Sequence, residues 1–241
     1  SDLARPLLEA GDWFQYVDLR RQWETLTKDQ TCAGAALDMA VLDWVSRKLD
    51  VPLWRMLGLD KSKAPVTTFS IGIDTPEVVK QKVREAADFP VLKIKVGRDN
   101  DAEILKAVRE VTDVPLRVDA NEGWRDKQTA LDRIRWLQDL GVELIEQPMP
   151  AAMLDETAWL RDRVEIPIIA DEAVKRAGDI PKLAQAYDGI NIKLMKAGGI
   201  QEALRMIHIA RALDMQIMLG CMIASSVSIT AAAHLSPLID Y

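Results

Sequence analysis

The sequence predicts a (β/α) barrel, in which parallel strands alternate with helices. From residue 66 onward, seven short apolar runs alternate with seven helical patterns at a spacing of about 25 residues, which is typical of a parallel sheet. An open doubly wound sheet would show a glycine-rich phosphate turn after an early strand, and this sequence has none. The number of units and the length of 241 residues therefore favour a barrel.

Residues 1–60 show helical patterns only. A long helix is expected from Thr31, which we interpret as its N-cap, and a short helical turn at Leu53–Leu57 is stopped by Gly58. The polar stretch Asp60–Pro65 is expected to be a linker. The predicted strands are Val66–Ile73, Val91–Val96, Leu116–Ala120, Leu144–Glu146, Ile168–Asp171, Ile190–Leu194 and Gln216–Leu219.

Each predicted strand is followed by a predicted helix. The helices are expected to begin at Pro76, Asp101 and Asp126, and near Leu154, Ile180, Ile200 and Ser226. An eighth strand would begin where the sequence ends at Tyr241, so we expect a chain that is incomplete at both ends. The predicted fold is a TIM-type (β/α)7β barrel, truncated before the last strand.

Five predicted strands carry a charged residue at, or one residue before, their carboxyl end: Lys95, Asp119, Glu146, Asp171 and Lys193. In a parallel barrel the carboxyl ends of the strands carry the chemistry, so the five side chains are expected to meet at one end. Three adjacent carboxylates suit Mg²⁺, which prefers oxygen ligands, and a cation would neutralise carboxylates set in apolar sequence. The alternative is three ordinary rim carboxylates that are paired with cations or solvated. The neighbouring Glu122 and Glu172 are expected to point elsewhere and to support the site or the fold.

Two lysines of one strand, Lys93 and Lys95, lie two residues apart and therefore face the same side, which should be the barrel interior. A lysine near a cation can have a lowered pKa and act as a base, although Lys93 could instead be a counter-ion for the carboxylates. Lys193 lies across the predicted barrel. Two bases on opposite faces of a metal-bound carboxylate suit racemisation or epimerisation through an enediolate.

Five motifs resemble the enolase superfamily, in the subgroup of muconate-lactonizing enzymes: KIK at 93–95, VDAN at 118–121, IEQP at 145–148, ADE at 170–172 and NIKLMKAGGI at 191–200. This resemblance implies that Lys95 and Lys193 are the acid/base pair and that Asp119, Glu146 and Asp171 bind one Mg²⁺. It also implies that residues 1–60 are the helical C-terminal part of a capping domain and that 61–241 form the catalytic barrel.

Within the subgroup the chain is most similar to dipeptide epimerases of the L-Ala-D/L-Glu type, on the segments TTFSIGID at 67–74, KLMKAGG at 193–199 and GCMIASSVSITAAAHL at 220–235. The resemblance implies Mg²⁺-dependent epimerisation of a dipeptide by two-base proton transfer. It implies that Thr68, Lys93, Cys221 and Ile223 contact the substrate, although Thr68, Cys221 and Ile223 could simply pack in the barrel. Family members usually carry an acidic residue at Ala224.

The family reads the amino group of the dipeptide with paired aspartates on the eighth strand, which would lie beyond Tyr241, and we do not assign that role to Asp240. Alternatives on the same scaffold are o-succinylbenzoate synthase, N-acylamino acid racemase and muconate cycloisomerase. A different class is a Schiff-base aldolase with Lys193 as nucleophile, which would leave three carboxylates unexplained. A non-catalytic scaffold is a further alternative, and it predicts no dependence on Mg²⁺.

The composition limits the possible partners. A net charge of −6 without a basic block argues against nucleic acid and anionic membranes, and no apolar run is long enough to span a bilayer. The expected partner is a small-molecule carboxylate, with a homo-oligomer possible through exposed tryptophans. Cys32 and Cys221 do not suggest a disulfide framework, so a cytoplasmic location fits, and we interpret His208 and His234 as structural.

Overall fold

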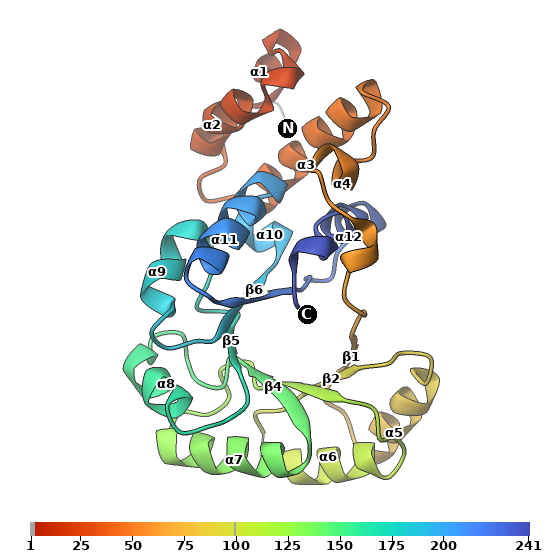
Figure 1. Ribbon diagram of the computed structural model, residues 1–241, viewed down its shortest axis with the longest axis vertical. Helices are drawn as coiled ribbons and strands as arrows, with labels where there is room; N and C mark the ends of the chain where they lie inside the picture. The colour runs from red at the N-terminus through yellow and green to blue at the C-terminus, as the bar shows by residue number, and fades with distance from the viewer. Residues whose placement is uncertain (1–2, 99) are drawn as a thin grey trace.

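In the computed structural model of the protein, which describes residues 3–98 and 100–241, seven parallel strands form one curled sheet (Figure 1). Each strand pairs with the next in chain order, as in a barrel. The strands are β1 Phe69–Ile71, β2 Leu92–Lys95, β3 Leu116–Asp119, β4 Val142–Glu146, β5 Ile168–Ala170, β6 Gly189–Ile192 and β7 Gln216–Leu219. The predicted fold class and all seven predicted strands are confirmed.

The helices that follow the strands cover the outside of the sheet (Figure 1). They are α5 Pro76–Glu85, α6 Asp101–Arg109, α7 Lys127–Asp139, α8 Leu154–Arg161, α9 Ile180–Leu183, α11 Ile200–Ala212 and α12 Ser226–Ala233. A side-chain cap begins α7, because Asp126 accepts a hydrogen bond from the backbone N–H of Thr129. Sequence analysis missed one helical turn, α10 Leu194–Ala197, which directly follows β6.

Strand alternation gives the sheet two different faces. Outward side chains such as Ile94, Val118 and Ile145 join the helices in the main hydrophobic core. The inward face carries a small apolar cluster of Leu144, Ile169 and Met218, against which Tyr241 packs, together with charged side chains. The backbone of Tyr241 hydrogen-bonds to Ile217 and Leu219, so the last described residue lies beside β7.

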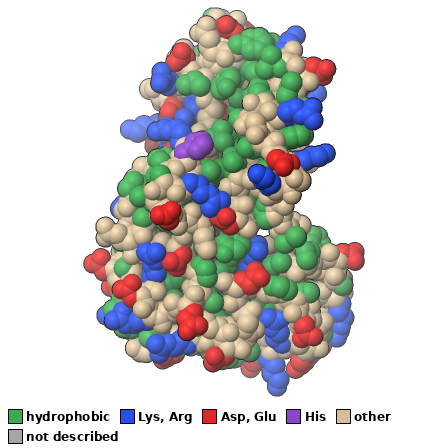
Figure 2. Space-filling view, in the orientation of Figure 1, with side chains coloured by type: hydrophobic (Ala, Val, Ile, Leu, Met, Phe, Trp, Pro, Cys, Tyr) green, Lys and Arg blue, Asp and Glu red, His purple; other side chains and the backbone are tan. Residues whose placement is uncertain are grey.

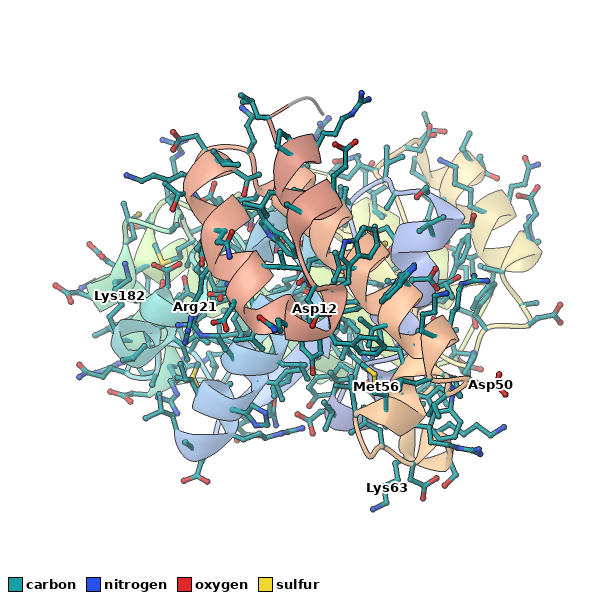
Figure 3. The ribbon with its side chains drawn as sticks, turned by 90° about the horizontal axis from the view of Figure 1, so that it is seen from above. Asp12, Arg21, Asp50, Met56, Lys63 and Lys182 are labelled. Atoms are coloured by element: carbon teal, nitrogen blue, oxygen red, sulfur yellow. The ribbon has the colours of Figure 1, made fainter. Side chains whose placement is uncertain are left out.

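Residues 3–60 contain the helices α1 Arg5–Ala10, α2 Tyr16–Leu26, α3 Thr31–Lys48 and α4 Leu53–Met56, which lie above one end of the barrel (Figure 1). Seen from above, Asp12 lies on the nearest layer, with Asp50 to one side and Lys182 of α9 to the other (Figure 3). The predicted N-cap was wrong. Thr31 is the first helical residue, and Gln30, at the cap position, makes no side-chain cap.

The long helix α3 is apolar on two sides because it lies between two layers. Met39 and Leu42 pack on the barrel core, whereas Val41 and Val45 pack on α2. A buried carboxylate adds to this contact: Asp38 accepts hydrogen bonds from the backbone N–H and the side-chain amide of Gln201, at the start of α11. The helix α3 is thereby fixed to the segment that follows Lys193. The boundary that we predicted at residue 60 stays a prediction.

Within the described residues, no helix is both long enough and apolar enough to cross a membrane. Both cysteines, Cys32 and Cys221, are free. Basic and acidic side chains are interspersed over the face shown in Figure 2.

Candidate active site

The five charged residues of the predicted pattern lie at the carboxyl end of the sheet. Lys95, Asp119 and Glu146 are the last residues of β2, β3 and β4 and are in register with one another. Asp171 and Lys193 each come one residue after the end of their strand, β5 and β6. The structure therefore brings together the residues that the sequence pattern selected.

Glu146 lies at the centre of this group and is fully buried. Its Oε2 atom accepts a hydrogen bond from Lys93 at 2.7 Å, and its Oε1 atom accepts one from the amide of Asn191 at 2.8 Å. Burial raises the pKa of Glu146 to about 7; Lys93 opposes this rise, whereas the carboxylates of Asp119 and Asp171 add to it. The three carboxylates are thus close enough to repel one another.

Lys93 serves as a counter-ion inside the sheet. Its Nζ atom also lies 3.1 Å from Oδ2 of Asp119. Burial would lower the pKa of Lys93, but the charges of Glu146 and Asp119 outweigh burial and raise it. Lys93 is therefore an ammonium group. Of the two roles that the sequence left open, base and counter-ion, this agrees with the counter-ion.

Asp171 has two lysine partners. Lys193 lies 2.6 Å from its Oδ2 atom, and Lys196 lies 2.6 Å from its Oδ1 atom. Burial would raise the pKa of Asp171, but Lys196 and Lys193 outweigh burial and lower it. Sequence reasoning missed Lys196, which also donates to the main-chain oxygens of Asp171 and Asn191. The available signal was its place one helical turn after Lys193.

Gln147 ties the ends of two strands together. Its buried side-chain oxygen accepts hydrogen bonds from the backbone N–H groups of Asp171 and Ala173. Its side-chain nitrogen donates to the main-chain oxygen of Met149 and to the hydroxyl of Tyr187. All polar positions of the amide are used, so the turn that carries Asp171 is held against the residue that follows Glu146.

The loops after β2 and β3 touch through two glycines. A Cβ atom on Gly123 would lie 2.5 Å from Cα of Gly97, and one on Gly97 would lie 2.5 Å from the main-chain oxygen of Ala120. Gly97 also has φ +105°, which favours glycine. This close approach brings Lys95 and Asn121 side by side, with Nζ of Lys95 2.6 Å from Oδ1 of Asn121.

The donor set suits a hard divalent cation, because it consists of three carboxylates of which the central one is buried and repelled by the other two. The lysines now neutralise these carboxylates. Among residues 3–98 and 100–241, no group of three or more His, Cys, Asp or Glu side chains is arranged to hold a metal ion. Binding a cation therefore requires Lys93, Lys193 or Lys196 to move from the carboxylate oxygens.

The residues expected to contact the substrate are more scattered than the five charged residues. Thr68 precedes β1 and accepts a hydrogen bond from the buried Arg117, which is in register with Lys93. The residue of β1 that is in register with Lys93 is Ser70. Arg117, which sequence reasoning missed, also pairs with Glu143 and lies over the ring of Tyr241.

The loop after β7 is open to solvent. Cys221 is exposed and Ile223 is fully exposed. Ile223 and Ala224 line a groove of about 720 Å³ between α3 and α12. The structure places these two residues near Met195 of α10, which lines the same groove, and no hydrogen bond among the described residues links them to the carboxylates.

The chain matches a known protein family over most of its length. The model of the family described as "Enolase C-terminal domain-like" matches residues 77–240. The chain belongs to this family. The family that the sequence motifs predicted is thereby confirmed.

Curated members of the enolase C-terminal domain-like family resemble this chain over most of its length. It is 47% identical over 236 residues to an L-Ala-D/L-Glu epimerase of Bacteroides thetaiotaomicron, a match that covers 98% of this chain and 62% of that protein. It is 42% identical over 219 residues to a hydrophobic dipeptide epimerase of Roseobacter litoralis, covering 87% of this chain and 63% of that protein. The chain thus spans about three-fifths of the length of these relatives.

Solved structures of family members are also similar. A dipeptide epimerase from Enterococcus faecalis V583 superimposes with a TM-score of 0.87 at 36% identity, covering 94% of this chain and 68% of that one. A dipeptide epimerase from Cytophaga hutchinsonii, complexed with Mg and the dipeptide D-Ala-L-Val, gives a TM-score of 0.89 at 28% identity, covering 95% and 65%.

Proposed function

We propose that the protein epimerises a dipeptide of the L-Ala-D/L-Glu type by moving the α-proton of one residue from one face to the other. The observation that carries this proposal is the placement of Lys95 and Lys193 at the carboxyl ends of β2 and β6, with the three carboxylates at the ends of the strands between them. The names of the similar proteins support a dipeptide as substrate.

The proposed roles of the two lysines are complementary. One lysine, as the free amine, removes the α-proton, and the other, as the ammonium ion, gives a proton to the opposite face. After one turnover the two lysines have exchanged protonation states, so each can serve as acid or base for the opposite epimer. This requires Lys193 to leave its contact with Asp171 when it acts as a base.

We assign Asp119, Glu146 and Asp171 as the residues that would hold one Mg²⁺. When bound there, the ion would neutralise the negative charge that grows on the substrate carboxylate as the α-proton leaves. Lys93 would stay an ammonium group beside Glu146 and Asp119 and add to the positive field around the substrate carboxylate.

The substrate contacts by Thr68, Cys221 and Ile223 remain proposals that derive from the family resemblance. The exposed position of Cys221 and Ile223 is compatible with contact to a ligand that enters from this side. A homo-oligomer and a cytoplasmic location are likewise proposals.

The test is an NMR assay of the full-length protein in deuterated water with Mg²⁺. We expect the α-proton signal of the second residue of L-Ala-L-Glu to disappear as the other epimer forms. Lys95→Ala and Lys193→Ala should each abolish epimerisation, whereas Lys182→Ala, an exposed lysine of α9, should not change it.

Two results would contradict the proposal. Full epimerisation by both single-lysine variants would exclude the two-base mechanism, and a protein that exchanges no dipeptide α-proton would exclude the substrate class. Trapping of a carbonyl substrate on Lys193 by borohydride would instead favour the Schiff-base alternative.

A further inference from the structure

We propose that Asn121 and Glu172 are positioning residues that orient the Lys95 amine, and so control proton transfer on one face of the substrate. This inference rests on the proposed function. It concerns two polar residues that no part of the mechanism above uses, and it arises from a continuous line of contacts that joins the ends of β2, β3 and β5.

The two lysines are held differently. Nζ of Lys193 is bonded to the Asp171 carboxylate at 2.6 Å, and its side chain is 13% exposed. The side chain of Lys95 is 38% exposed, and its Nζ atom lies 2.6 Å from the amide oxygen of Asn121 but 3.6 Å from the Asp119 carboxylate. The direction of the Lys95 amine is therefore set by a neutral amide.

Asn121 is itself fixed on three sides. Its side-chain nitrogen donates to Oε1 of Glu172 at 3.2 Å, and its backbone N–H donates to Oδ1 of Asp119 at 3.0 Å. Its φ of +42° is a left-handed value that asparagine tolerates. Because Glu172 occupies the donor end of the amide, the acceptor end must face Lys95.

Glu172 has no other apparent task. Its Oε2 atom is buried and has no hydrogen-bond partner among the described residues, and its Oε1 atom receives the Asn121 amide. A carboxylate in such a place is costly, which argues for a role beyond the stability of the fold. Its negative charge polarises the amide, which makes the oxygen of Asn121 a stronger acceptor for Lys95.

The side chain of Asn121 contacts Lys95, and neither it nor that of Glu172 has a hydrogen bond to Lys193 within the part of the chain that the structure describes. Among the described residues, the hydrogen bonds of Lys193 and Lys196 go to Asp171 and to the main chain, and none reaches Asn121 or Glu172. Loss of the Asn121–Glu172 pair should therefore misplace one base and leave the other in position.

The test compares the two epimers. Initial rates of α-proton exchange in deuterated water are measured separately for L-Ala-L-Glu and L-Ala-D-Glu, with the full-length protein. The variants are Asn121→Gly, which keeps the positive φ without strain, and Glu172→Ala; Lys193→Ala identifies the epimer whose proton Lys95 removes. In both variants we expect the rate for that epimer to fall about tenfold or more relative to the other epimer.

The matched control is Asn191→Ala, which removes a side-chain amide that contacts Glu146 and the loop after β7. It should slow both epimers alike. If the ratio of the two rates in Asn121→Gly and Glu172→Ala equals that of the unmodified protein, the positioning role is wrong. Absence of exchange with either epimer in the unmodified protein would instead contradict the proposed function.

Discussion

The Nζ atom of Lys93 lies 2.7 Å from Oε2 of Glu146, and the two side chains are 14% and 0% exposed. This ion pair lies inside the sheet, where neither charge has enough water to replace its partner. Breaking the pair on one side leaves Glu146 or Lys93 as a buried charge without this partner, whereas removing both charges leaves Asp119, which keeps Lys95 at 3.6 Å.

We therefore predict that Lys93→Met lowers the free energy of unfolding by about 3 kcal/mol, and that adding Glu146→Gln recovers much of this loss. Denaturant unfolding measures both. Lys80→Met, which breaks the outer pair with Glu110, is the matched control and should lower the free energy of unfolding much less than Lys93→Met. If Lys93→Met and Lys80→Met lower the free energy of unfolding equally, the buried pair does not stabilise the fold more than the outer pair does.

The contact of α3 with α11 depends on Asp38. Asp38→Ala removes the acceptor for two hydrogen bonds of Gln201, so we expect a loss of about 1–3 kcal/mol. Hydrogen exchange should also become faster in the first turn of α11. Asp43→Ala on the same helix, where the pair with Arg47 is exposed, should change neither quantity noticeably. If hydrogen exchange in α11 is unchanged in Asp38→Ala, Asp38 does not hold α3 against α11.

We predict that protonation of His234 makes the stability of the fold depend on pH. Its Nδ1 atom accepts the backbone N–H of Trp54, which only a neutral ring can do. Burial lowers the pKa of His234 from 6.5, although Asp43 opposes this. The imidazole of His234 thus binds a proton more readily in the unfolded chain than in the folded one. The stabilisation that the neutral ring contributes is therefore complete above pH 6.5 and is lost as the pH falls toward the lowered pKa of the folded state.

His234→Gln should accordingly reduce the loss of unfolding free energy between about pH 7 and pH 5. His208→Gln, at an exposed position of α11, should leave the profile unchanged. If the two variants have the same profile as the unmodified protein, the hydrogen bond to Trp54 does not carry the effect.

Removal of divalent cations should stop α-proton exchange, and Mg²⁺ should restore it, because three mutually repelling carboxylates need a cation before a substrate carboxylate can approach. Calorimetric titration should detect Mg²⁺ binding by the unmodified protein and much weaker binding by Glu146→Gln. Circular dichroism shows whether the fold survives removal. Exchange that continues at full rate in EDTA would rule out the metal requirement.

The sequence was sufficient for the strands and for the main charged residues, because both follow from spacing. A period near 25 residues places every strand end on one side of the sheet, and a charge that closes an apolar run stands out against it. Lys95, Asp119 and Glu146 are consequently in register, as expected.

Contacts that depend on side-chain packing could not be predicted in this way. Lys196 reaches Asp171 only because α10 forms directly after β6, and no pattern marks a helix of four residues. The substrate contact expected of Thr68 stays a prediction; β1 begins one residue later, and Ser70 is the residue level with Lys93. Two positions along a strand move a side chain by about 7 Å, so such assignments need the register itself.

The contact between Gly97 and Gly123 has a consequence for engineering. Because each backbone fills the space that a side chain on the other would need, neither Gly97 nor Gly123 can be replaced alone. A library that varies these loops should therefore keep both glycines. The loop after β7, where Cys221, Met222 and Ile223 are exposed, offers the freedom that those two loops lack.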